Sequence, residues 1–506
     1  MRAGPLLAAT AVLSSAAPAL GAGFYITDIG TRGMGRAGAF VAAPDSLLAI
    51  HYNPAGLALL SGFHGEASVS MVDFVARFQR SCPCTPGTTD GAAACDAQLE
   101  ADFAGNEAHT ETPIAIPFLA FGYGLPWLDT TVAVAAYGPN SGRHNWGDLP
   151  ATNSPLYESA ARASPQRYRA LDVDNLEANL ALAVAFSPVR GLRIGASGYA
   201  YATGSDQGLT LWTNFDSFPE APEDPRFDVP VQFQLQNTWG FNWGVGVSWE
   251  PIEGLSVGSS FRALRKIRGQ GKLQAQLPRF LIDPSTGQPL LGAQVNGDDV
   301  IISLRVAPIW RGGVQYRLPG WFRAEGAVVW EGWSTHDKIT IEPQGVSFDL
   351  QGDRFEIPVL YLDRQWRDTW AVRIGGELER FEPYLGLRAG YFYETSAVPE
   401  ARVDAARIDR PKHGVALGVA TTLYGITVEL SGMYVRLANH ESTDSQIVMT
   451  RIFTEPTGSD RYLTTVGNGA VRGQYFIGSL SLSFALDALG GTGARRKTAA
   501  TFELGK

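Results

Sequence analysis

The chain has 506 residues, with 41 Lys and Arg against 50 Asp and Glu, which gives a formal net charge of −9. Aromatic residues make up 11% and charged residues 18% of the chain, which excludes a disordered protein. The same composition argues against a nucleic-acid partner, because phosphates are met by basic stretches. After the N-terminus no apolar run reaches the ~18 residues of a membrane-spanning helix, so a large soluble protein and a membrane β-barrel remain.

Residues 1–21 have the pattern of a secretory signal peptide. Met1-Arg2 is a short basic start, and residues 5–20 are apolar and mostly small. Small residues at Ala19 and Gly21 predict cleavage near residues 19–22, which would export the mature chain. A buried N-terminal helix is the alternative interpretation of the same stretch.

Residues 22–62 are rich in Gly and Ala and lack the alternation found later in the chain. They contain Gly33-Met34-Gly35-Arg36-Ala37-Gly38, which formally matches G-x-G-x-x-G. We reject a dinucleotide site, since no βαβ unit surrounds the motif and no acidic residue follows at the ~20-residue distance of a ribose contact. Glycines permit close backbone packing in a narrow space, so we predict an N-terminal plug inside a barrel.

The three cysteines, Cys82, Cys84 and Cys95, lie close together in one predicted long loop. In an oxidising compartment a disulfide from Cys95 to either Cys82 or Cys84 would staple this loop and leave one thiol. A Cys-x-Cys pair with one further Cys and no adjacent His is a poor zinc site, so no metal is predicted.

From residue 63 onward, apolar and polar or small residues alternate. In residues 474–486, Phe476, Leu480 and Leu482 share one parity, whereas Ser479 and Ser481 share the other. Residues 239–249, 369–378 and 424–434 alternate in the same way. A period of two indicates β-strands. One apolar face beside one polar face fits either a sandwich or a barrel with lipid outside.

The connections between strands favour the barrel. Short turns and long loops alternate strictly, which a sandwich does not require and an outer-membrane barrel shows. The fourteen predicted strands cover residues 64–79, 114–124, 128–138, 169–187, 191–205, 229–250, 254–275, 298–317, 321–343, 361–379, 383–397, 411–422, 425–440 and 470–486. The predicted long loops are residues 80–113, 139–168, 206–228, 276–297, 344–360, 398–410 and 441–469.

We therefore predict an all-β fold, a 14-stranded antiparallel transmembrane β-barrel over residues 63–486 with the plug in its lumen. Residues 487–506 would form a periplasmic C-terminal extension, since an even number of strands returns both ends to the same side. Tryptophans near predicted strand ends are typical of an interfacial girdle. These are Trp127, Trp239, Trp249, Trp321, Trp330, Trp366 and Trp370.

Short motifs are distributed along nearly the whole mature chain. They are Ala22-Gly23-Phe24, Gly35-Arg36-Ala37, Asn53-Pro54-Ala55-Gly56-Leu57, Ser164-Pro165-Gln166-Arg167-Tyr168, Asn237-Thr238-Trp239-Gly240-Phe241-Asn242-Trp243, Pro308-Ile309-Trp310, Glu331-Gly332-Trp333-Ser334, Arg367-Asp368-Thr369-Trp370, Leu387-Arg388-Ala389-Gly390, Ser396-Ala397-Val398-Pro399 and Arg407-Ile408-Asp409-Arg410. In these motifs and in their order the chain resembles the FadL/TodX (OMPP1) family of outer-membrane transporters of hydrophobic compounds.

This resemblance implies gated, passive uptake of long-chain fatty acids or aromatic hydrocarbons, with sideways exit toward the bilayer at a kink in the third strand. The kink corresponds here to Gly138-Pro139, where Gly and Pro break a ladder; a simple strand end is the alternative. The resemblance assigns the hatch, as the family's plug is called, to a set that includes Gly33, Gly35, Arg36, Asn53 and Pro54. The mature N-terminus, Phe24, Tyr25 and Ile26, is the favoured lining of the ligand pocket.

Inward strand parity nominates further lumen residues. Arg373, Arg388 and Phe392 are candidates for ligand binding, since either guanidinium would pair with a carboxylate head group. The alternative is that these arginines anchor the plug through ion pairs with Asp28 or Asp45. Glu377, Glu394 and Glu429 share the inward parity.

The sequence departs from the family pattern in two places. The Cys-containing loop is not a general family feature, and residues 487–506, with Arg495-Arg496-Lys497, follow the last strand. The assembly signal is therefore expected to be internal or to be carried differently.

The predicted location is the outer membrane of a Gram-negative bacterium. The expected partners are outer-membrane lipid and lipopolysaccharide, a hydrophobic ligand and the barrel-assembly machinery. No cofactor and no nucleic acid are expected, and the barrel is predicted to be a monomer. The alternatives are a barrel enzyme, for which Asp45, Ser46 and His51 lie close in sequence, and an open diffusion porin.

Overall fold

The computed structural model describes residues 28–81, 106–125, 128–139, 142–213, 223–449 and 465–486. The predicted signal peptide, the three cysteines, Trp127 and residues 487–506 lie outside the described residues.

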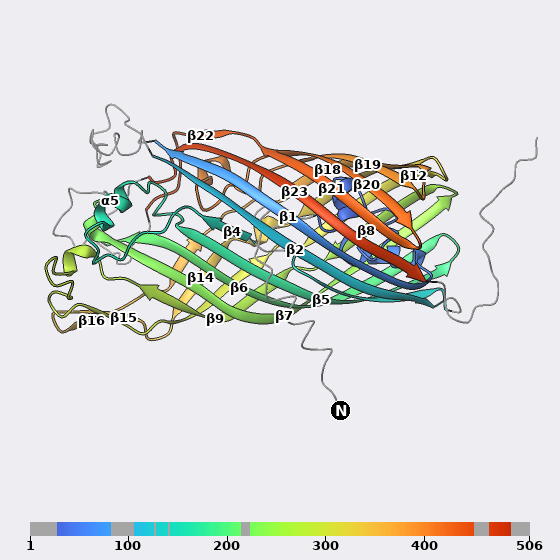
Figure 1. Ribbon diagram of the computed structural model, residues 1–506. Helices are drawn as coiled ribbons and strands as arrows, with labels where there is room; N and C mark the ends of the chain where they lie inside the picture. Colours follow the sequence, from blue (N-terminus) through green and yellow to red (C-terminus); the bar gives the residue numbers. More distant parts are fainter. Residues whose placement is uncertain are drawn as a thin grey trace, which may run out of the picture.

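A single antiparallel sheet of twenty strands closes on itself, because β1 pairs with both β2 and β23 (Figure 1). We use the word stave for one complete crossing of the barrel, whether its strand is continuous or interrupted. Six staves consist of two successive strands each, so the twenty strands form fourteen staves in the described part of the chain. The predicted 14-stranded barrel is confirmed.

The staves follow one another in chain order around the barrel. They are β1 (Gly62–Arg80), β2 (Glu107–Leu125), β3 (Thr130–Tyr137) with β4 (Gly142–Asn145), β5 (Asp172–Val189), β6 (Leu192–Trp212), β7 (Asp228–Ile252), β8 (Leu255–Arg262) with β9 (Arg265–Ala275), β11 (Asp299–Val306) with β12 (Ile309–Leu318), β13 (Phe322–Glu331) with β14 (Lys338–Pro343), β17 (Leu360–Asp363) with β18 (Thr369–Phe381), β19 (Leu385–Glu394), β20 (Lys412–Leu423), β21 (Ile426–Leu437) with β22 (His440–Ser442), and β23 (Gly469–Leu486).

The predicted strand faces are also confirmed. Leu480 on β23 and Leu430 on β21 are 46% and 55% exposed on the outer surface, whereas their neighbours Ser481 and Glu429 are buried on the inner face. The same alternation places Trp239, Phe241 and the large apolar residues that follow them on β7 outside, whereas Val229, Val231, Phe233 and Leu235 at the long-loop end of β7 are buried. An apolar outer surface of this extent on a closed barrel faces lipid.

Aromatic side chains mark the upper and lower limits of this outer band. Near the long-loop end, Trp310, Trp330 and Trp370 form one row, since Trp330 is the direct cross-strand partner of both others. Near the short-turn end lies Trp321, in the turn directly before β13 and nine residues before Trp330. At 3.4 Å per residue and a tilt near 40°, nine residues rise about 23 Å, close to the apolar band of known barrels. Trp366 is an exception to the predicted girdle, because it is buried on the inside at 4% exposure.

A charge placed on this outer band should destabilise the barrel. We expect Leu480→Arg, six residues from the short-turn end of β23, to lower the free energy of unfolding by about 2–4 kcal/mol. Tyr424→Arg, in the fully exposed turn after β20, is the matched control and should cost about 0–1 kcal/mol. Urea unfolding in lipid vesicles, followed by heat-modifiable gel mobility, measures both; equal losses would contradict the assignment of the outer face to lipid.

Most interruptions of the staves lie on the long-loop side of the tryptophan row. Beyond them the loops carry a small separate sheet of β10 (Gln294–Asn296), β15 (Ser347–Leu350) and β16 (Asp353–Glu356). Short helices complete the chain: α2 (Thr31–Gly35), α3 (Ala49–Tyr52), η1 (Pro54–Leu59), α5 (Tyr157–Arg162), η2 (Pro225–Phe227), η3 (Arg279–Leu281), η4 (Trp333–Thr335) and η5 (Glu400–Arg402). None of the helices in the described ranges is long and apolar enough to cross a bilayer.

The second stave differs from its prediction. It begins at Glu107 rather than at residue 114, so it contains both Pro113 and Pro117. Proline is tolerated in a strand only where its nitrogen faces away from a hydrogen-bonded neighbour. The pairing of β2 with β1 runs without a break past both prolines. Their nitrogens must therefore face the third stave, and the pairing on this side of β2 is the incomplete one.

Candidate functional site

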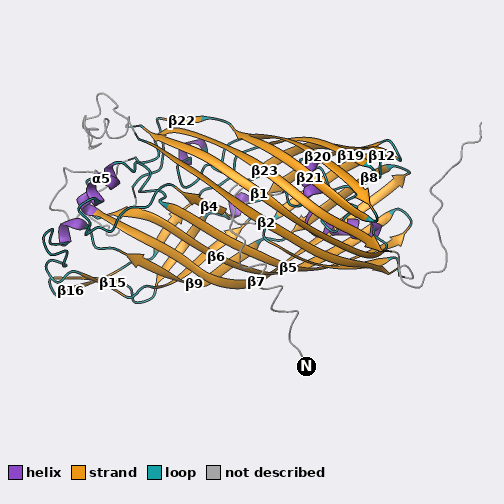
Figure 2. Cartoon of the chain, viewed as in Figure 1, coloured by secondary structure: helices purple, strands orange, loops and turns teal. Residues whose placement is uncertain are grey.

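Residues 28–61, called the hatch from here on, fill the lumen at the short-turn end of the barrel (Figure 2). The helices α2, α3 and η1 belong to it, and nearly all of its side chains are buried. Gly33 faces Tyr52 so closely that a Cβ would lie 2.4 Å from the hydroxyl oxygen. Tyr52 in turn accepts a hydrogen bond from the Ile29 amide and donates one to its carbonyl, both at 3.0 Å. The glycine therefore allows the two helical turns of the hatch to pack together.

Asn53 and Pro54 join the hatch to the wall. The Asn53 side chain accepts a hydrogen bond from the Ala55 amide at 3.2 Å, which caps η1, while Pro54 occupies the first turn. The side-chain Nδ2 atom of Asn53 donates a hydrogen bond to the carbonyl of Val247 on β7 at 3.0 Å. A Cβ on Gly246 of the same strand would come within 2.0 Å of the Asn53 oxygen. A wall glycine is thus required where the hatch touches the strand.

Arg36 ties the centre of the hatch to β13. Its buried guanidinium lies 3.2 Å from the Glu325 carboxylate. The other oxygen of Glu325 accepts hydrogen bonds from the amides of Val41 at 2.5 Å and Ala42 at 3.0 Å. One wall carboxylate therefore satisfies three hatch donors. The backbone of Arg36 also touches the wall, and Gly35 lies next to Gly418 of β20.

Arg373, on the inner face of β18, contacts the start of the hatch. Its guanidinium donates to Asp28 at 2.5 Å and to the Ala37 carbonyl at 2.9 Å, and it lies over the ring of Phe392 at 4.9 Å. The ion pair with Asp28 is the hatch anchor that was expected as the alternative to ligand binding. Phe392 is buried beneath Arg373, so the two form one contact.

Arg388 belongs to a second set of ion pairs. It donates to Glu377 and to Glu429, each at 2.7 Å. Glu377 also forms an ion pair with Arg32 of the hatch, at 3.1 Å. Buried pairs of this kind contribute little net free energy when intact, but losing one partner leaves an uncompensated charge and costs about 3–5 kcal/mol. The hatch is consequently held at several points along its length.

The third stave is interrupted at the predicted place. β3 ends at Tyr137, and β4 resumes at residue 142 against β5. The pairing between β2 and β3 stops at Phe118–Tyr137, directly beside Pro117. Among the described residues, no backbone ladder joins β4 to β2, although the Asn145 amide donates to the Thr110 hydroxyl at 3.1 Å. Gly138 and Pro139 therefore lie at a break between two incompletely paired staves.

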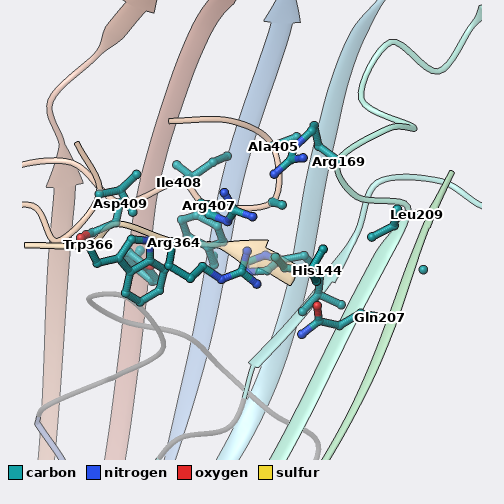
Figure 3. A pocket seen from close by; sticks show the side chains of 17 residues that line it. His144, Arg169, Gln207, Leu209, Arg364, Trp366, Ala405, Arg407, Ile408 and Asp409 are labelled. Carbon is teal, nitrogen blue, oxygen red and sulfur yellow. The ribbon is translucent and has the colours of Figure 1, made fainter. Parts of the chain in front are cut away.

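Two cavities occupy the long-loop half of the barrel. The first lies between β1, β6, β17 and the segment 395–411, and Figure 3 shows Arg364, Arg407 and His144 converging on it. His144 belongs to β4, so this cavity borders the broken stave. Its apolar lining includes Phe74, Val173, Leu209, Leu362, Ile408 and Tyr475.

The second cavity has no charged side chain in its lining. Leu211 and Leu360 line it, and each lies two residues along the same strand from Leu209 and Leu362 of the first cavity. The cavities are neighbours, since residues two apart on a strand share a face about 7 Å apart. Other lining residues are Val229, Leu273, Phe348 and Ile357.

Several sequence-predicted residues lie outside the described residues: Phe24, Tyr25 and Ile26, and the cysteines Cys82 and Cys95. The hatch residues Gly33, Gly35, Arg36, Asn53 and Pro54 are brought together in the lumen, whereas Gly138 and Pro139 lie apart from them in the wall. Sequence reasoning missed Arg364 and the second cavity. Arg407 was recognised only as part of a family motif. Its place in the wall of the first cavity, together with Arg364 from a different segment, was not recognisable from the spacing of residues in the sequence.

The candidate catalytic residues of the hatch have other contacts. Asp45 pairs with Arg32 and with Arg323, at 3.3 and 2.7 Å. Both ring nitrogens of His51 face guanidinium groups, those of Arg262 and Arg311. A catalytic histidine is instead oriented by a carboxylate and faces the nucleophile.

A closed 14-stranded barrel with an apolar band, a filled lumen and loop-side cavities defines an outer-membrane transport barrel. The sequence profile of the family described as outer membrane protein transport protein (OMPP1/FadL/TodX) matches residues 10–419. The chain belongs to this family. Its location is the outer membrane.

Solved structures share the fold at low sequence identity. A Pseudomonas aeruginosa FadL homologue has a TM-score of 0.66 at 16% identity, covering 92% of this chain and 100% of the other. The toluene transporter TodX of P. putida reaches 0.60 at 14% identity, covering 91% and 99%. The toluene transporter TbuX of Ralstonia pickettii reaches 0.56 at 13%, also covering 91% and 99%. No curated protein sequence matches significantly.

Proposed function

We propose that the protein carries hydrophobic small molecules across the outer membrane by passive, gated diffusion, with sideways exit toward the bilayer. The observation that carries this proposal is the position of the first cavity, whose lining includes β4 of the broken third stave. A ligand in this cavity has a short path to lipid through the break, while the hatch closes the path along the barrel axis.

The physical reason for such a route is the behaviour of apolar molecules in water. Moving one CH₂ group from water into apolar surroundings is favourable by about 0.8 kcal/mol, and a water-filled pore does not provide this stabilisation. The second cavity, with its apolar lining, receives the molecule among the loops. The first cavity then holds it beside the break. Pro113 and Pro117 support this path, because they leave the facing edge of β2 without two of its donors.

The division of the chain into a signal peptide (1–21), hatch domain (22–62), barrel (63–486) and periplasmic extension (487–506) is part of the proposal. So are the gating role of Phe24, Tyr25 and Ile26, which precede the anchored residue Asp28, and a disulfide involving Cys82 and Cys95. Arg373, Arg388 and Phe392 are proposed to act on the ligand only through the position of the hatch.

The protein is proposed not to be an enzyme, since Asp45 and His51 are engaged by arginines. An open porin is disfavoured because buried contacts hold the hatch in the lumen. The proposed partners are lipopolysaccharide and the barrel-assembly machinery, and the proposed state is a monomer.

Uptake by whole cells tests this function. A Gram-negative host that lacks its own transporter of this kind should take up labelled oleate or toluene faster when it produces this protein than with an empty vector. The purified protein should also retain a hydrophobic molecule that mass spectrometry identifies. Unchanged uptake of both compounds, together with a large steady conductance for polar solutes in planar bilayers, would contradict the proposal and favour a porin.

A further inference from the structure

The first cavity has an uneven distribution of charge. Its walls are mostly apolar, but Arg169, Arg364 and Arg407 all reach into it from different segments (Figure 3). Arg169 is neutralised, because its Nε atom donates to the Asp404 carboxylate at 2.6 Å. Asp409, the acidic residue in the lining, is neutralised by Lys412 at 2.7 Å. Two positive charges, on Arg364 and Arg407, are therefore in excess.

Neither of these two guanidinium groups has an ion pair or a side-chain hydrogen bond with any residue that the structure describes. The Nε atoms of both are fully buried without a partner, and Arg364 as a whole is only 5% exposed. Buried polar groups are normally satisfied, and a buried charge that lacks a partner is especially unfavourable. A pair of such groups in one cavity is therefore suited to binding an anion.

The pKa shifts of the two arginines also indicate an excess of positive charge in the cavity. Burial, followed by the neighbouring Arg169, lowers the pKa of Arg364 to about 10. Burial and the neighbouring Arg364 lower the pKa of Arg407 well below its usual value. Asp404 and Asp363 act in the opposite direction on Arg364 without reversing the shift. The guanidinium groups nevertheless keep their charge at neutral pH, so the cavity presents a positive potential.

We propose that Arg364 and Arg407 bind the carboxylate head of an amphiphile whose hydrocarbon chain lies in the adjoining apolar cavity. Planar guanidinium groups match a carboxylate with two parallel hydrogen bonds. The second cavity begins two residues further along β6 and β17, and its lining carries no charge. The inference rests on the proposed transport function and narrows its substrate to a fatty-acid-like monoanion. A neutral aromatic hydrocarbon would leave both guanidinium groups unpaired.

Four probes in competition binding to the purified, full-length protein test this assignment. They are myristate, myristyl alcohol, myristyl phosphate and toluene. Myristate should bind at least about tenfold more tightly than the alcohol, since a charge-assisted hydrogen bond contributes at least that much. Arg364→Met and Arg407→Met should each remove this preference and leave the affinity for the alcohol within about twofold. Arg354→Met, on the exposed strand β16, is the matched control and should change neither affinity.

Thermal unfolding without ligand separates this role from a structural one. Because Arg364→Met removes an uncompensated buried charge, the ligand-free variant should be as stable as the unchanged protein or more stable. A lower melting temperature would indicate a structural role and overturn the assignment. Equal affinities for acid and alcohol in the unchanged protein, or tighter binding of the phosphate than of the carboxylate, would also overturn it. In either case binding of the alcohol or toluene would still support hydrophobic transport, whereas binding of none of the four would contradict both proposals.

Discussion

Cells that produce the Gly138→Trp variant are expected to lose most uptake of a labelled fatty acid while the purified variant still binds it. Gly138 lies at the break of the third stave, outside the cavity lining, so the indole should block the exit and leave the cavity unchanged. A blocked exit reduces the rate without changing the equilibrium for binding. Uptake and ligand retention, measured on the same preparations, distinguish the two effects.

Gly326→Trp is the matched control for this variant. Gly326 lies on the outer face of β13, where an added Cβ meets nothing within 4 Å. It receives the same bulk at a position where the pairing of β13 with β12 and with β18 is unbroken, and it should transport normally. If Gly138→Trp transported as well as Gly326→Trp at equal abundance in the membrane, exit through this break would be excluded.

Replacing Glu325 with leucine should release the middle of the hatch. The substitution leaves the buried Arg36 guanidinium and the amides of Val41 and Ala42 without their acceptor. We expect a loss of about 3–5 kcal/mol, the usual effect of removing one partner of a buried pair. The amides of Val41 and Ala42 should exchange with deuterium much faster, and channel openings should appear in planar bilayers.

Glu356→Leu, at an exposed position of β16, is the control for this variant and should alter neither measurement. Slow exchange of the Val41 and Ala42 amides in Glu325→Leu would mean that the wall glycines and Asn53 hold the hatch without the carboxylate. The account of hatch anchoring would then be wrong.

The strand faces were predictable because lipid on one side and a filled lumen on the other impose a strict period of two. Leu480 and Ser481 are adjacent in the sequence, one apolar and one polar, and this alone assigns them to opposite faces of the strand. The start of the second stave was not predictable in this way. Pro113 and Pro117 normally end a strand, and they are tolerated here only because the adjacent stave is broken. This break is a property of the third stave, distant from the prolines in the sequence.

The hatch contacts illustrate a different limit. The glycines of the hatch indicate close packing, but the sequence does not say that Asn53 meets Gly246 or that Glu325 accepts three donors. These pairings are set by how fourteen staves curve around the lumen. Arg364 and Arg407 are similar, since each lies in an ordinary polar stretch of sequence. Their lack of partners appears only once the neighbours of the cavity are known.

The most direct test of sideways transport is to map where a photoreactive fatty acid crosslinks to the protein during uptake by cells. The account predicts adducts in the first cavity, for example on Phe74 or His144, and at the break, on Gly138, Pro139, β4 and the facing part of β2. Adducts on the short-turn side of the hatch, at Leu59 and Ser61, with none along the break would contradict it and indicate an axial path into the periplasm.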